Sequence, residues 1–110
     1  MSTRTSALLR RPNDPSLLVL TSLTSGPKHR YALLKDVEDF AGVKLSPGTL
    51  FGAITRLEEL GLIEPLKGVE RRHPYRRTSN GAQALREVTS EMRRLANVGF
   101  TRLRLATGNA

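Results

Sequence analysis

The spacing of apolar residues predicts two short helices before residue 43. The first lies in "NDPSLLVLTSLTSGP", where Asp14 is a candidate N-cap, Pro15 takes the first helical position and a Gly-Pro pair ends the helix. The second lies in "KHRYALLKDVEDFAG" and ends at Gly42. We expect His29, just before it, to satisfy a backbone group at its start. Four apolar or aromatic residues of this helix recur at helical spacing: Tyr31, Leu34, Val37 and Phe40.

A third helix is predicted in "LSPGTLFGAITRLEELGLIE", with Ser46 as N-cap and Pro47 behind it, and it ends at Gly61. Its apolar stripe comprises Leu50, Ile54 and Leu57, flanked by Ala53 and Leu60. At 100° per residue, the opposite side holds Gly48, Phe51, Gly52, Thr55, Arg56 and Glu59. A plain solvent-facing helix usually carries more charge there, so the pattern favours contact with another molecule.

After Gly61 the periodicity changes. The short segments "LIEPLK" and "HPYRRT" predict a two-stranded hairpin, in which Pro65 and Pro74 are tolerated if both strands are edges. Thr78 or Ser79 is expected to cap a final long helix. The order helix, helix, helix, hairpin, helix is that of a winged helix-turn-helix. The expected fold class is mainly α with a two-stranded β-wing, followed by a C-terminal dimerisation helix.

The final helix carries apolar residues at steps of three, four and three, the spacing of a coiled-coil seam. This stripe could pack on the chain's own core or on a second copy. Because it continues beyond the reach of one small domain, we expect a homodimer, with the segment from Leu85 to Leu95 carrying most of the energy and Gly99 weakening the seam. The expected dimerisation residues are Leu85, Val88, Met92, Leu95 and Leu103.

The 110 residues are long enough for one domain with a modest core. We divide them into a basic N-terminal arm at 1–13, a winged helix-turn-helix domain at 14–78 and a C-terminal dimerisation helix and tail at 79–110. There is no cysteine, which agrees with a reducing cytoplasm. No apolar run approaches the length of a membrane span, so no membrane partner is expected.

Positive charge is concentrated in the arm and the hairpin. The chain has 18 Lys and Arg residues against 10 Asp and Glu residues, a net charge of +8. Within 67–77 there are five cations and one acid. Clustered positive charge favours a polyanion partner over a merely solvated basic surface. Together with the winged-helix order, this indicates double-stranded DNA.

In that interpretation the third helix enters the major groove and the hairpin grips the backbone. Thr55 can meet a thymine methyl or donate to an acceptor, and Arg56 can reach a guanine or a phosphate. Ser46 and the free amides at the helix start suit a phosphate oxygen. The expected DNA contacts are Ser46, Thr49, Phe51, Thr55, Arg56, Lys67, Arg71, Arg72, Tyr75 and Arg77.

Three segments, "TSLTSGPKHRYALLKDV", "LSPGTLFGAITRLEELGLIE" and "RRHPYRRTSNG", resemble the PadR family of transcription regulators in order and spacing. The resemblance implies a dimeric winged-helix repressor, often regulated by a small-molecule effector. It places Thr49, Phe51, Thr55 and Arg56 on the recognition helix, and Arg71, Arg72 and Tyr75 on the wing. Here Phe51 replaces the family's usual tyrosine, Gly52 its proline, and Arg30 the glycine after histidine.

The sequence offers little for other chemistry. His29 and His73 are the only histidines and lack a surrounding ligand cluster, so neither a metal site nor a cofactor is expected. No nucleophile or phosphate-loop motif is present, so we expect no enzyme. No effector can be assigned. The alternative function is a winged-helix protein-interaction module, using the apolar residues Phe51, Ala53 and Leu66.

Overall fold

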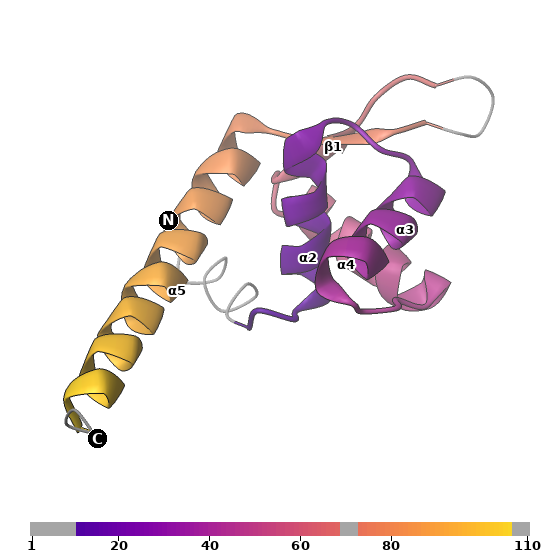
Figure 1. Ribbon diagram of the computed structural model, residues 1–110. Coiled ribbons are helices and arrows are strands. Elements are labelled where there is room, and N and C mark those ends of the chain that lie inside the picture. Colours follow the sequence, from indigo (N-terminus) through magenta and orange to yellow (C-terminus); the bar gives the residue numbers. More distant parts are fainter. Residues whose placement is uncertain (1–10, 69–72, 107–110) are drawn as a thin grey trace.

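The computed structural model describes residues 11–68 and 73–106. Three short helices gather into a compact body, a hairpin extends from it, and the last helix projects away on the other side (Figure 1). This order confirms the mainly helical fold with a two-stranded wing. The elements are α2 (Pro15–Ser22), the 3₁₀ helix η1 (Leu23–Ser25), α3 (Arg30–Ala41), α4 (Pro47–Glu59), β1 (Ile63–Pro65), β2 (Tyr75–Arg77) and α5 (Ser79–Ala106).

Helix α2 forms the centre of the core. The Asp14 carboxylate accepts a hydrogen bond from the Ser16 amide at 2.8 Å, and Pro15 follows the cap, as predicted. The residues from Ser16 to Leu20 are all buried, and the helix packs against α3, α4 and α5. A helix that is apolar all round needs cover on every side, which the other three helices supply.

Helix α3 turns a different face to the core than the apolar spacing indicated. Of the four residues at helical spacing, Val37 is fully buried and Leu34 is partly buried, whereas Tyr31 is 76% and Phe40 47% exposed. Leu33, four residues before Val37, completes the buried face. His29 is the N-cap, but its side chain makes no capping hydrogen bond, so that expectation was wrong.

Helix α4 follows its predicted pattern closely. Leu50, Ala53, Ile54 and Leu57 are buried against α2. Because Ala53 is 1% exposed, it cannot contribute to an outer apolar surface, contrary to its place in the protein-interaction alternative.

Strand β2 of the hairpin is hydrogen-bonded to the segment that precedes α3. Strand β1 pairs with β2 in antiparallel register, and β2 also pairs with Lys28, whose amide and carbonyl bond the Tyr75 backbone at 3.0 and 2.9 Å. The sheet has two strands, so both are edges, as expected, and the outer side of β2 is covered by the Lys28 bridge at Tyr75. Pro74 is tolerated because it precedes the strand, where its carbonyl accepts from the Leu66 amide at 2.8 Å.

Helix α5 divides into two parts with different surroundings. The Thr78 hydroxyl caps its start, accepting from the Gly81 amide at 3.0 Å and donating to the Gly61 carbonyl at 2.7 Å. The buried residues of α5 are Gly81, Ala84 and Val88, and Leu85 and Met92 pack against the same core. The core thus continues past residue 78, the predicted domain boundary.

From residue 93 to 106 the helix leaves the core, and its large apolar side chains are exposed. Leu95 is 74% and Leu103 62% exposed. The predicted seam is therefore corrected: Val88 belongs to the chain's own core, as Leu85 and Met92 do in part. Any surface that α5 offers to a second copy lies mainly beyond Met92.

Candidate nucleic-acid interface

The outer face of α4 is open and has glycine at two positions among larger side chains. Gly48, Phe51, Thr55, Arg56 and Glu59 are all exposed, as predicted. A Cβ added to Gly48 would meet nothing within 4 Å, and one added to Gly52 would meet only Arg56 Nη2, at 3.7 Å. The chain's own packing therefore does not require glycine at either position.

A glycine inside a helix costs about 1 kcal/mol relative to alanine. That cost applies to Gly52, in the interior of α4, which has no packing role among the described residues and leaves the backbone open to an approaching molecule.

Ser46 and Thr49 form a hydrogen-bonded pair at the start of α4. The Ser46 hydroxyl accepts from the Thr49 amide at 3.1 Å and donates to Thr49 Oγ1 at 2.9 Å. The bond from the Thr49 amide confirms Ser46 as the N-cap. The bond to Thr49 Oγ1 occupies the hydroxyl proton of Ser46, which is then not available to a ligand. Thr49 keeps its own hydroxyl proton for an outside acceptor, so Thr49 is the better donor to a phosphate oxygen.

Arg56 lies along the same face. Because its Nη2 atom is the nearest neighbour of Gly52, the guanidinium reaches back one turn toward the middle of the outer face. A guanidinium there can present its fork of donors to a base edge or a phosphate.

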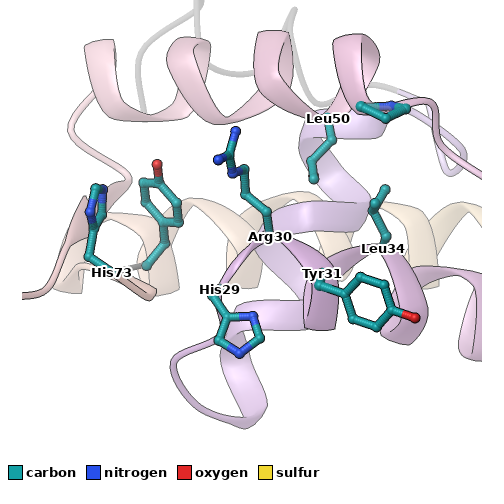
Figure 2. Close-up of a pocket in the computed structure, with 8 residues that line it drawn as sticks. His29, Arg30, Tyr31, Leu34, Leu50 and His73 are labelled. Atoms are coloured by element: carbon teal, nitrogen blue, oxygen red, sulfur yellow. The ribbon is translucent and has the colours of Figure 1, made fainter. Parts of the chain in front are cut away.

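A hollow of about 560 Å³ separates α4 from the hairpin. Figure 2 shows Arg30 extending from the start of α3 toward α4, while His29 and Tyr31 point the other way. The hollow combines an apolar floor with basic and aromatic walls, and its lining residues are His29, Arg30, Tyr31, Leu34, Pro47, Leu50, His73 and Tyr75.

Sequence reasoning missed the part that α3 plays here. By sequence, Arg30 stands out only as a departure from the family's glycine, and Tyr31 only as part of a helical stripe. A usable signal was present, because three large polar or aromatic residues in succession, at 29–31, precede the first buried residue of α3.

Tyr75 is half-buried in this hollow, with its ring edge-on to His73 at a centroid distance of 5.4 Å. Partial burial raises the pKa of the Tyr75 hydroxyl, the charge of Glu58 raises it further, and Arg30 opposes the shift. The phenol is thus protonated at neutral pH and able to donate a hydrogen bond.

The cations predicted to contact DNA from the wing differ in their exposure and in their partners. Lys67 is exposed at the end of the described part of the hairpin, whereas Arg71 and Arg72 lie outside the described residues. Arg76 pairs with Glu64 at 3.3 Å across the strands. Arg77 is exposed but lines a second groove, with η1 and the start of α5, so it is not brought together with Tyr75.

None of the helices in 11–68 and 73–106 combines the length and apolar character needed to cross a bilayer. In the same ranges, His, Asp and Glu side chains nowhere gather in a group of three that could hold a metal ion.

The fold and this surface define a class: a winged helix, in which α3 and α4 form the helix-turn-helix and the hairpin the wing. The chain belongs to the PadR-like family of transcriptional regulators, whose family model matches residues 19–87.

Relatives of known structure share this fold. A PadR family transcriptional regulator from Eggerthella lenta is 32% identical, with a TM-score of 0.68 over 81% of this chain and 80% of the other. A PadR family transcription regulator from Clostridium difficile is 24% identical, with a TM-score of 0.72 over 81% and 97% of the two chains.

One match among curated sequences is a 37.1 kDa uncharacterized protein in transposon TN4556 of Streptomyces fradiae. The two are 40% identical over 90 residues, which is 82% of this chain and 26% of the transposon protein. The chain therefore spans about a quarter of that relative.

Proposed function

We propose that the protein is a homodimeric repressor that binds a palindromic DNA site through α4. The observation that carries this proposal is the outer face of α4, where two glycines without a packing role leave the backbone open to a base edge. The α4 side chains point outward around them, and the wing stands beside them across the hollow.

The start of α4 would hold a phosphate through the Thr49 hydroxyl, while Arg56 and Thr55 meet base edges in the major groove. Arg30 and Tyr75, on either side of the hollow, supply a cation and a neutral donor for the adjoining backbone. The pairing of Lys28 with Tyr75 fixes the base of the wing to the start of α3, so the two contacts keep their relative position.

The dimer would form through the exposed part of α5. Two-fold symmetry would then place the two recognition helices about one helical turn, roughly 34 Å, apart. A dimer bound across both half-sites blocks access to a promoter, which is the action we propose. Such a regulator carries out no catalysis and works in the cytoplasm on chromosomal or plasmid DNA.

Selection from a random duplex library tests the proposal. We expect a palindromic consensus with half-sites about one turn apart for the wild type. We expect Arg56→Ala to enrich a different or degenerate base at one position per half-site, because a good bidentate contact gives roughly 1–3 kcal/mol of discrimination. An unchanged consensus would limit Arg56 to a phosphate contact, and no enriched sequence at all would contradict specific binding.

The wing is expected to contribute sequence-independent affinity. Replacing Arg71 and Arg72 with alanine should weaken specific and non-specific binding alike, and should reduce the slope of log affinity against log salt by roughly 1 to 2 units. Fluorescence anisotropy at several salt concentrations measures both. Arg76→Ala is the matched control, because Arg76 is already paired with Glu64 and its loss should change the slope less. Equal slopes in all three proteins would show that Arg71 and Arg72 do not neutralise phosphates.

A second candidate function is a protein-interaction module, which the exposed rings of Tyr31 and Phe51 favour. The dependence of binding affinity on salt concentration distinguishes the two functions. A complex dominated by phosphate contacts weakens steeply as salt rises, whereas an apolar protein interface weakens little.

A further inference from the structure

Thr55 and Phe51 lie one turn apart on the outer face of α4, and both side chains are exposed. The Thr55 hydroxyl donates to the Phe51 carbonyl at 3.0 Å. A hydroxyl has one proton, so this bond leaves Thr55 without a donor for a base. What the side chain offers outward is its methyl group and the lone pairs of its oxygen.

Phe51 contributes no polar atom, and its ring is 58% exposed. The glycines beside it add no side chain, so a ligand can come close to both the ring and the threonine methyl. An apolar patch of this kind on a DNA-reading face has one matching group in the major groove. That group is the C5-methyl of a pyrimidine, which thymine carries and unmodified cytosine lacks.

We propose that Phe51 and Thr55 together read the C5-methyl group of a pyrimidine in each half-site. This inference rests on the proposed function and names the chemistry that α4 recognises. Thymine and 5-methylcytosine present the same methyl group, so a protein that reads in this way distinguishes thymine from uracil, and methylated from unmethylated cytosine.

The test begins with the selected consensus duplex. Each thymine of a half-site is replaced in turn by uracil, which removes only the methyl. We expect one position at which affinity falls roughly 4-fold, the value of one buried methyl-sized group. At that position, 5-methylcytosine should bind roughly 4-fold more tightly than cytosine, which identifies the methyl as the group that is read.

Two substitutions of Thr55 separate methyl from hydroxyl recognition, and the exposure of Thr55 allows the fold to accept both. Thr55→Ser keeps the hydroxyl and should reduce the thymine-to-uracil ratio toward one. Thr55→Val keeps the methyl and should preserve the ratio. The opposite result, a ratio kept in Thr55→Ser and lost in Thr55→Val, would overturn the inference in favour of hydrogen bonding through the hydroxyl oxygen.

Failure of the inference can be told apart from failure of the proposed function. A clear consensus with no sensitivity to uracil at any thymine overturns the methyl reading and leaves specific DNA binding intact. Absence of any consensus overturns both.

Discussion

Replacing Leu95 and Leu103 with glutamate is expected to give a folded monomer that binds the selected operator about 100-fold more weakly, or worse. Both side chains project from the part of α5 that leaves the core, with 74% and 62% of their surfaces exposed. Burying a leucine contributes about 1.5–3 kcal/mol, so a seam repeated in two copies is enough to hold a dimer. Glutamate removes that burial and places like charges opposite one another. A monomer contacts only one half-site.

Multi-angle light scattering at tens of micromolar gives the mass. The wild type should show twice the 12.2 kDa of one chain, and the double variant should show 12.2 kDa. Val88→Ala is the contrasting control, because Val88 is 4% exposed and packs on its own core. It should lower the free energy of unfolding while the protein that remains folded stays dimeric. A wild type that runs as a monomer would exclude α5 as the dimer interface.

Gly81→Ala is expected to destabilise the fold by about 3 kcal/mol. A Cβ at Gly81 would overlap the Leu62 carbonyl oxygen and lie 3.0 Å from its carbonyl carbon. That carbonyl cannot easily move, because it accepts a hydrogen bond from the Thr78 amide at 3.0 Å. The substitution would therefore push α5 away from the start of β1.

Urea denaturation measures this change in the free energy of unfolding. Gly99→Ala is the matched control, since a Cβ there would meet nothing within 4 Å, and helix propensity alone predicts a gain of up to about 1 kcal/mol. If Gly81→Ala proved as stable as the wild type, the close approach of α5 to Leu62 would be contradicted.

The fold was predictable because N-cap residues, prolines and glycines mark the ends of its helices clearly. Asp14 with Pro15, and Ser46 with Pro47, start helices where the sequence indicates, and the α4 stripe is buried as its period requires. The face of α3 was harder to assign, since its apolar residues cover more than one side. Which of them is buried depends on where α2 lies, and no local pattern contains that information.

The site was predictable along α4 and much less so elsewhere. Its outer face follows from helical geometry once the stripe is known. The hollow beside it joins residues from α3, α4 and the hairpin, far apart in the chain, so spacing could not reveal the role of Arg30. The burial of the α5 stripe was hard to assign for a related reason. An apolar stripe that is buried in the core at one end and exposed at the other has one continuous period, so Val88 and Leu95 look alike in sequence.

In the proposed function, the missing side chains at Gly48 and Gly52 let DNA approach the α4 backbone closely. Gly52→Ala tests this, because it should raise the stability of the fold and lower the affinity for DNA. The added methyl meets only Arg56 Nη2 at 3.7 Å, so the free energy of unfolding should rise by up to about 1 kcal/mol. Affinity for the selected operator, measured by fluorescence anisotropy on the same protein, should fall about 10-fold, as for an overpacked contact costing about 1.4 kcal/mol. A variant that is more stable and binds its operator as tightly as the wild type would contradict a close approach of DNA to Gly52.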